Sequence, residues 1–326
     1  MNAHLGVAVA LAVFVAGCAA SGSTGGSATP TIAAMATATP TQTPVASASE
    51  SPGIKTGLRP VWVAESGDAV WVANTDEGSI SQIDPATGAV VATVKIPDAG
   101  KIVALAAGTD FVFAISVDRR RLDRIDVATH EVESFAIESD YGGLSMGGNW
   151  LWHAASSGEL MRIDPTTGAV ETRLAVGDPG PPASLVADGE GAWVASGEKL
   201  VHVTGDPLVI AGTWDIAPES QLAIDGDMVW AIGAGGTAVG VAMDTGETSE
   251  PITLPVEPFM ADAAGGSLWL RGIDLDLIKV DPRSGATQAV YPIDGSDYPG
   301  GFVVDGDEAW IANLDRGTVS RLELAP

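Results

Sequence analysis

The sequence predicts an all-β protein, a seven-bladed β-propeller with four-stranded antiparallel blades. A unit of about 40 residues recurs seven times. Each unit contains only strand and turn signals, and the N-terminal segment can supply the one strand that the last unit lacks. A ring of such units is typical of a propeller, because each sheet buries its faces against its neighbours.

An aromatic residue after one or two apolar residues anchors each unit. The anchors are Trp71, Phe113, Trp152, Trp193, Trp230, Trp269 and Trp310, with spacings of 42, 39, 41, 37, 39 and 41 residues. Six of these anchors follow a glycine by four residues, and Phe113 follows one by five. We expect these rings to be core that packs between blades, rather than a cofactor or sugar-stacking site.

Four strands follow one another in every unit. An inner strand such as Lys101–Ala107 comes first, and a tight turn such as Asp225-Gly226 leads to the anchor strand. The third strand ends in Ile-Asp or Val-Asp. An Asp-Pro-x-Thr/Ser-Gly turn, as in Asp84–Gly88, then opens the fourth strand, with proline fixing φ and glycine closing the turn.

The last unit stops at Leu324, after its third strand. Ser47–Thr56 directly precedes the first inner strand and is the predicted replacement. This pairing would close the ring by joining both ends of the chain in one blade. Pro52 is acceptable there because the fourth strand is an outer edge.

The first residues are typical of an export signal. Leu5–Ala16 is an apolar run of 12 residues, too short to span a bilayer. Val15-Ala16-Gly17-Cys18 resembles the lipobox of bacterial lipoproteins, which implies cleavage before Cys18 and lipid attached to it. The alternative is an ordinary cleaved signal with an incidental cysteine. We expect a lipid-anchored protein on the extracytoplasmic face of a cell membrane.

Ala19–Pro52 has the composition of a tether. Of its 34 residues, 29 are Ala, Ser, Thr, Gly or Pro, which leaves almost nothing to bury. The predicted organisation is a signal peptide at 1–17, a lipidated cysteine with a disordered tether at 18–52, and the propeller at 53–326.

Charge restricts the partners. The formal net charge is −26, and only Glu50 among the charged side chains precedes Gly53. Such a body repels phosphate backbones, so no nucleic-acid partner is expected.

The stretch from Trp71 to Val94, WVANTDEGSISQIDPATGAVVATV, resembles bacterial YVTN-type and streptogramin-lyase-type propeller repeats. The resemblance covers about residues 58–324. It implies the fold, and streptogramin lyases use histidine and glutamate with a magnesium ion.

The histidines of this chain do not reproduce the lyase set. We expect His153 to be buried, His202 to be a solvated strand residue, and His130 to lie in a turn away from the site. No His-x-Glu or His-x-His pairing occurs, so no catalytic residue is assigned by resemblance. No cofactor is predicted, although a divalent Ca²⁺ or Mg²⁺ could bind.

Function on a propeller tends to lie on variable loops over a rigid scaffold. The fourth-to-first and second-to-third loops vary here and share one face. Their candidate ligand-binding residues are Arg59, Lys101, Tyr141, Glu219, Phe259, Asp297 and Tyr298, with the basic cluster Arg119, Arg120 and Arg121. Each could instead belong to a solvated rim.

The leading hypothesis is a membrane-tethered lipoprotein whose propeller binds an envelope protein, peptide or glycan without catalysis. One alternative is a divalent-metal-dependent lyase or hydrolase on the variable face. Another is a structural assembly platform.

Overall fold

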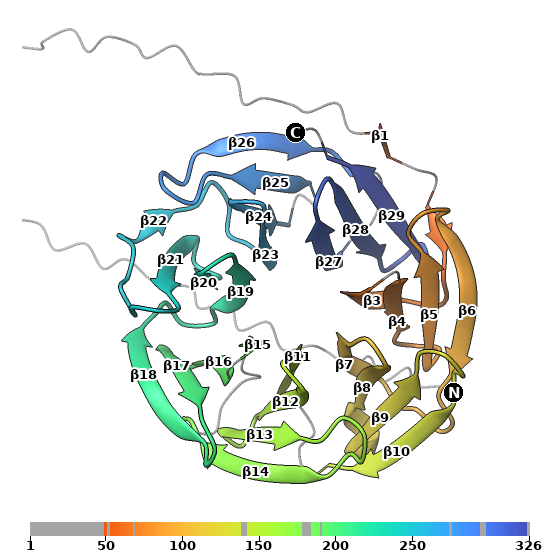
Figure 1. The fold of residues 1–326 in the computed structure, drawn as a ribbon. Helices are drawn as coiled ribbons and strands as arrows, with labels where there is room; N and C mark the ends of the chain where they lie inside the picture. Colours follow the sequence, from red (N-terminus) through yellow and green to blue (C-terminus); the bar gives the residue numbers. More distant parts are fainter. Residues whose placement is uncertain are drawn as a thin grey trace, which may run out of the picture. The chain divides into compact units, whose positions relative to one another are not determined.

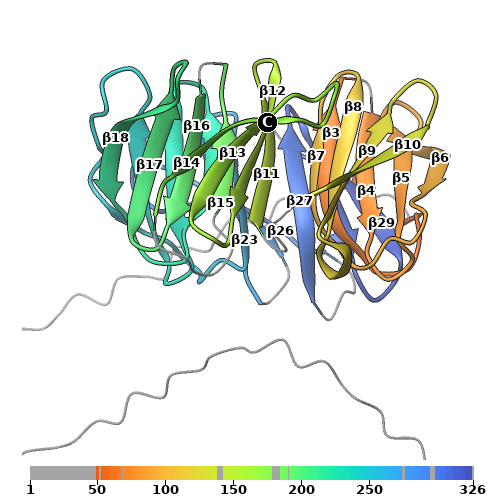
Figure 2. The same cartoon turned by 90° about the horizontal axis from the view of Figure 1, so that it is seen from below.

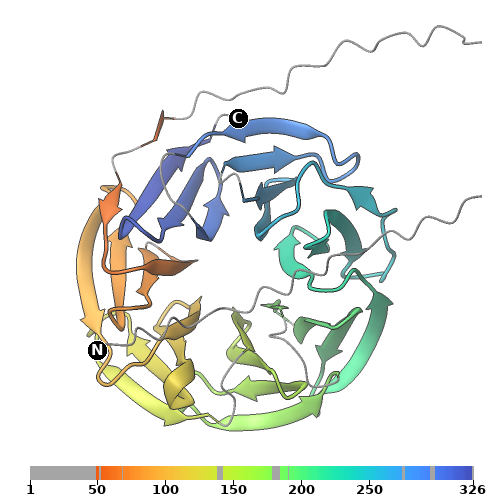
Figure 3. The same ribbon diagram turned by 180° about the vertical axis from the view of Figure 1, so that it is seen from behind.

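Seven antiparallel sheets stand around a central axis in the computed structural model (Figure 1), which confirms the predicted propeller. The structure describes residues 49–50, 53–67, 69–137, 142–177, 184–189, 191–273, 276–293 and 298–324. The predicted signal and nearly all of the predicted tether lie outside these residues. Figure 3 shows the ring from behind.

The strands follow the predicted order, from the axis outwards, in each blade. The first three blades contain β3 (Pro60–Ser66), β4 (Ala69–Asn74), β5 (Ser79–Asp84) and β6 (Ala89–Lys95); β7 (Ile102–Ala107), β8 (Phe111–Ser116), β9 (Arg121–Asp126) and β10 (Val132–Ala136); and β11 (Gly142–Gly147), β12 (Trp150–Ala155), β13 (Glu159–Ile163) and β14 (Val170–Ala175). A single 3-10 turn, η1 (Val117–Arg119), joins β8 to β9 within the described chain.

Blades 4 to 6 repeat this order, and blade 7 contains three strands from the C-terminus. They are β15 (Ser184–Ala187), β16 (Gly191–Ser196), β17 (Lys199–Thr204) and β18 (Val209–Asp215); β19 (Gln221–Asp225), β20 (Met228–Gly233), β21 (Thr237–Ala242) and β22 (Ile252–Thr253); β23 (Met260–Ala264), β24 (Ser267–Arg271), β25 (Leu277–Val280) and β26 (Thr287–Tyr291); and β27 (Pro299–Asp305), β28 (Glu308–Asn313) and β29 (Thr318–Glu323).

The N-terminal segment closes the ring as predicted. Two short strands, β1 (Ser49–Glu50) and β2 (Ile54–Lys55), both pair antiparallel with β29. The outer edge of blade 7 is thereby covered by residues from the opposite end of the chain, which satisfies backbone groups that an open edge would leave unpaired.

The anchor residues form the core between blades. All seven are at most 7% exposed, which confirms that they are structural. Trp71, for example, packs on Ile102, Val112 and Ile125 of the next blade. Burying a large aromatic ring at each blade junction stabilises the ring as a whole.

In several blades the third-strand residue paired with the anchor lies over an aromatic ring. Arg162 lies 4.7 Å from the ring of Trp150, and Lys279 and Arg321 each lie 5.3 Å from their anchors. His202 occupies this position in blade 4 and stacks on Trp193 at 4.0 Å, with the rings 5° apart. The expectation that His202 is solvated was therefore wrong, because long or flat side chains at this position lie along the indole instead.

Polar side chains join the inner strands of neighbouring blades. The Ser145 hydroxyl accepts a hydrogen bond from the amide of Ala187 at 3.0 Å, and the Ser184 hydroxyl accepts one from Leu222 at 2.9 Å. Asp262 accepts one from Val304 at 3.3 Å. Unpaired edge amides near the axis therefore gain partners, which fixes the inner wall of the ring.

The carboxyl group of Glu65, between blades 7 and 1, has a raised pKa. Burial and the neighbouring carboxylate of Asp305, with a further contribution from Glu308, raise the pKa of Glu65 to about 7. Arg321, which pairs with Glu308, is the nearby cation. Two carboxyl groups at one blade junction are most stable when they share a proton.

We expect Glu65→Gln to flatten the pH dependence of stability. The folded-state pKa lies above the ordinary value of 4.5, so folding takes up a proton between those two pH values. The stabilisation is complete below the ordinary pKa and is lost as the pH rises to about 7. Thermal melting from pH 5 to 8 should therefore show a steeper fall for the unchanged protein than for the variant. Equal slopes would contradict the shared proton, and Asp98→Asn on the other face serves as control.

Candidate functional site

The two faces of the ring differ in their connections. One, the turn face, carries the first-to-second and third-to-fourth turns. The other, the loop face, carries the second-to-third and fourth-to-first connections. Figure 2 shows the blades from the side, with the strands running between the two faces.

The turn face is regular. In the turn after β5, Asp84 accepts hydrogen bonds from the Ala86 amide at 2.8 Å and the Thr87 hydroxyl at 2.9 Å. The bond from Thr87 is the main cause that lowers the pKa of Asp84. Gly88 closes the turn with φ of 68°, which favours glycine. The repeated Asp residues of this face therefore build turns.

A cavity of about 570 Å³ opens at the axis on the loop face, and we call it the axial pocket. One equivalent inner-strand position in six blades supplies much of its wall: Trp62, Ala104, Gly143, Ser184, Gln221 and Met260. Small residues in three blades leave room that the larger residues of the other three partly fill.

Glu219 lies at the rim of this pocket, in the connection from β18 to β19. The neighbouring Gln221 is fixed at both ends of its amide. Its Oε1 accepts from the Ala261 amide at 3.1 Å, and its Nε2 donates to the Phe259 carbonyl at 3.0 Å. The pocket thus has an ordered polar wall beside an apolar one, a combination typical of ligand sites.

Backbone strain is concentrated on the loop face. Of the five described non-glycine residues with positive φ, four lie there: Arg59 at 56°, Asp98 at 51°, Arg120 at 48° and Glu219 at 54°. Side chains with a Cβ avoid this region because of steric conflict. Three of the four are predicted site residues, and such strain tends to gather at functional positions.

The basic cluster has a partly structural role. Arg119 Nε donates to the Asp98 carbonyl at 3.1 Å, and Arg121 Nη2 donates to the Pro97 carbonyl at 2.8 Å. Arg121 Nε also lies 2.7 Å from Asp123, which is fully buried. Arg121 therefore fixes the loop between blades 1 and 2, whereas Arg119 and Arg120 are exposed.

The structure places the other predicted residues separately. Arg59 lies 3.8 Å from Asp76 in an exposed ion pair. Lys101 is exposed at the start of blade 2. Phe259 and Tyr298 are 50% and 63% exposed, in the connections before β23 and β27. Cys18, Tyr141 and Asp297 lie outside the described residues.

None of the three propeller histidines lines the axial pocket. His153 is buried, and its Nδ1 contacts the Gly143 carbonyl at 3.0 Å. Burial lowers its pKa to about 4, so it is neutral near pH 7. His130 contacts Gln82 at 2.9 Å on the turn face, as predicted. Together with His202 on Trp193, these side chains are engaged in packing.

No group of three or more His, Cys, Asp or Glu within the described chain is arranged to hold a metal ion. In that same part of the chain, no helix has the length and apolar character needed to cross a membrane.

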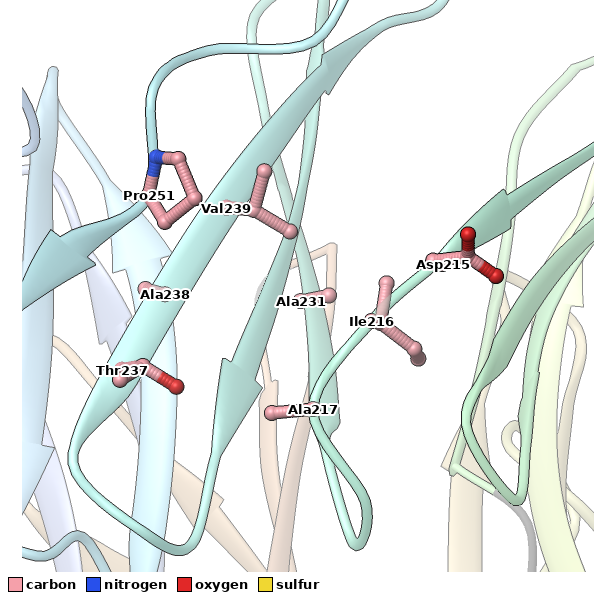
Figure 4. Close-up of a pocket in the computed structure, with 8 residues that line it drawn as sticks. All are labelled: Asp215, Ile216, Ala217, Ala231, Thr237, Ala238, Val239 and Pro251. Carbon is pink, nitrogen blue, oxygen red and sulfur yellow. The ribbon is translucent and has the colours of Figure 1, made fainter.

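Two further cavities lie between blades. One of about 870 Å³ opens on the turn face between blades 5 and 6, beside Asp227 and Glu250. A smaller one of about 190 Å³ separates β18 from β21 and is lined mainly by Ala, Val, Ile and Pro (Figure 4). Its lining is typical of imperfect packing between two blades.

Sequence reasoning missed Trp62, Gln221 and Met260 as walls of the axial pocket. The available signal was their repeat position, which small residues occupy in three other blades: Ala104, Gly143 and Ser184. Large residues at a repeat position that small residues occupy in other blades indicate where the axial pocket narrows.

Comparison with known proteins supports the fold. A family model described as a repeat of unknown function (DUF6923) matches residues 60–192. No curated protein matches the chain. The structure of virginiamycin B lyase from Staphylococcus aureus is similar, with a TM-score of 0.68 and 19% identity, covering 85% of this chain and 99% of that one.

Two other solved structures show the same likeness. A streptogramin B lyase has a TM-score of 0.68 at 14% identity, covering 85% of this chain and 98% of its own. BamB from Moraxella catarrhalis has a TM-score of 0.65 at 11% identity, covering 85% of this chain and 100% of its own. The predicted streptogramin-lyase-type resemblance is therefore confirmed at the level of the propeller fold.

We expect Glu219→Gly to stabilise the protein by about 1 kcal/mol, because glycine adopts the observed positive φ without steric conflict. Urea unfolding would measure the change. Glu219→Gln, which keeps the Cβ, is the control and should leave stability unchanged. A lower unfolding midpoint for the glycine variant would show that the side chain holds the loop in place.

Proposed function

We propose that this protein is a non-catalytic binding propeller, tethered through Cys18 outside the cytoplasm, and that the loop face is its binding surface. The observation that carries this proposal is the coincidence of three features on one face: the variable connections, the axial pocket and the strained residues Arg59, Arg120 and Glu219. Strained backbone is retained only where something offsets its cost, and ligand binding is a common reason.

The position of the incoming chain supports this orientation. Ser49 pairs with Glu323, at the turn-face end of β29, while Lys55 pairs with Thr318 at the loop-face end. The chain therefore reaches the propeller at the turn face. The first described residues of the propeller thus lie at the end of blade 7 opposite the proposed binding surface.

The second candidate is a metal-dependent lyase, favoured by the shared fold with two streptogramin-type lyases. Against it stand the positions of the histidines. His153, held neutral by burial, and His202, stacked on Trp193, are used in packing between and within blades. His153 is fully buried behind the wall residue Gly143 and is not open to the axial pocket.

Site-specific photocrosslinking in the native envelope would test the binding proposal. A photoreactive residue at Glu219 on the loop face should form a defined adduct, and one at Thr87 on the turn face should not. Cys18→Ala should move the chain from the membrane to the soluble fraction. Adducts of equal yield from both faces would contradict the proposal. Glu257 is an exposed carboxylate in the connection before β23. Metal-dependent turnover by residues 42–326 that Glu219→Gln or Glu257→Gln abolishes would favour the lyase.

A further inference from the structure

We infer that the loop face over blades 6, 7, 1 and 2 docks an acidic segment of a partner protein that also carries apolar side chains. This inference rests on the proposed function and specifies its surface and the chemistry of its partner. It depends on an exposed apolar set beside an exposed basic set.

Exposed apolar side chains gather in one part of the loop face, which we call the apolar sector. Its members are Leu58, Phe259, Ile273 and Tyr298, with exposed fractions of 65%, 50%, 86% and 63%. The other large exposed hydrophobic residues of the described chain, Val91, Val209 and Ile210, lie on the outer strands β6 and β18. Side chains of this size stay exposed as a group mainly where they contact a partner.

Hydrogen bonds place the connections that carry the apolar sector next to one another across blades 6 and 7. The Phe259 amide donates to the Arg271 carbonyl at 2.8 Å, which places Phe259 beside the strand that leads to Ile273. Arg271 Nη1 donates to the Gly300 carbonyl at 2.9 Å, next to Tyr298.

The sector then continues into blade 1. The Thr56 amide donates to the Gly317 carbonyl at 3.1 Å, so Leu58 follows directly from a segment bound to blade 7. The Leu58 amide in turn donates to Glu77 at 3.1 Å. The four apolar side chains therefore lie in neighbouring connections of blades 6, 7 and 1.

Basic side chains adjoin this sector over blades 7, 1 and 2, and we call them the basic sector. Its exposed members are Lys55, Arg59, Lys95, Lys101, Arg119, Arg120 and Arg316. They are seven of the 16 Lys and Arg in a chain with 42 Asp and Glu. Among the described residues, the carboxylates of these connections are fewer: Asp76, Glu77, Asp98 and Asp315, while Glu257 and Asp276 lie in the connections of blade 6.

This charge asymmetry identifies the partner's chemistry. A protein of net charge −26 repels anionic molecules in general, and the basic sector locally opposes this overall charge. Complementary charge steers association and selects a partner, while aromatic and arginine side chains supply much of the binding energy. An acidic segment with apolar residues would pair its carboxylates with the basic sector and pack its apolar side chains on the apolar sector.

The chain's own N-terminal segment does not fit this surface. Ala19–Pro52 contains one acidic residue, Glu50, and few large apolar side chains. An anionic membrane is also disfavoured, since the acidity of the whole body opposes its approach. A separate acidic protein segment is the occupant that the charges favour.

Peptide selection would test the inference. A random display library of twelve-residue peptides is selected on residues 42–326, and the enriched peptides are measured by fluorescence anisotropy. We expect enrichment of Asp or Glu with Leu, Phe, Trp or Tyr. Affinity should fall at least tenfold in Phe259→Ser/Tyr298→Ser and in Lys101→Gln/Arg120→Gln/Arg316→Gln. Higher salt should weaken binding further.

The matched control is Val209→Ser/Ile210→Ser, which removes similarly exposed apolar side chains from the outer strand of blade 4. Its affinity should not change, and thermal melting should show that all variants fold. Enriched peptides without acidic residues, or peptides that bind both test variants normally, would overturn the inference.

Two further outcomes would replace the inferred partner. Sedimentation with phosphatidylglycerol vesicles, lost in the apolar variant, would assign the surface to a membrane. A concentration-dependent dimer in light scattering, lost in the basic variant, would assign it to a second copy of this chain. A crosslink from Glu219 that persists in both variants would leave the proposed binding function intact while removing this surface from it.

Discussion

A chain that begins at Thr56, without β1 and β2, is expected to lose about 4 kcal/mol in free energy of unfolding. It loses the ladder to β29, whose backbone hydrogen bonds each contribute about 0.5–1.5 kcal/mol. It also loses Ile54, which packs on the cluster of Val70, Trp310 and Val319, and burial of such a side chain contributes about 1.5–3 kcal/mol. Urea unfolding measures the loss.

The matched control is the chain that begins at Gln42, which keeps both strands and should unfold like the full-length protein. A synthetic peptide of residues 47–57, added to the shortened chain, should restore part of the loss by pairing with β29. An unchanged unfolding midpoint in the shortened chain would mean that the closing strands contribute little. The ring would then be held by the contacts of β27 and β28 with β3.

The closure was predictable because it follows from counting. Seven anchors require seven outer strands, and the last unit ends at Leu324 without one. The anchors themselves were predictable for a related reason: a residue repeated seven times at nearly constant spacing reports a shared packing role. Trp193 and Trp310 fulfil it with 0% and 1% exposure.

The sequence predicted which face of the ring carries the variable loops, but it did not predict the contacts and backbone conformations on that face. Arg119 contacts the Asp98 carbonyl, and Arg124 contacts the Pro165 carbonyl 41 residues away, in the next blade. Such contacts depend on the distance between neighbouring blades, which leaves no periodic signal in the sequence. The positive φ of Glu219 is equally hidden, because the usual indicator of that conformation is glycine.

The misjudgement of His202 has a related cause. At the equivalent position, Gln82, Arg124, Arg162 and Lys279 are polar or charged, a composition that ordinarily indicates solvent exposure. The structure shows the three charged side chains lying over aromatic rings, with Arg124 4.4 Å from the centre of Phe111. Composition alone does not distinguish a solvated cation from one whose stem covers an indole.

Trp193→Ala is expected to destabilise the protein by about 3–5 kcal/mol, the range for removing a large buried aromatic side chain. The indole is fully buried and packs on Leu222, Val229 and Val241 of the next blade. Its Nε1 donates to Asp188 at 2.9 Å. Removing it leaves a cavity at the junction of blades 4 and 5 and takes away the surface on which His202 stacks. The unfolding midpoint in urea should fall accordingly.

Trp150→Ala is the matched control, because Trp150 is a partly exposed tryptophan of the ring, covered by Arg162. Its loss removes less buried area, so the effect should be less than half as large. Trp193→Phe separates the two contributions of the indole: it keeps most of the packing and loses the bond to Asp188, which should cost about 1–2 kcal/mol. If Trp193→Ala and Trp150→Ala were equally destabilising, the anchors would be covering side chains rather than the core of the blade junctions.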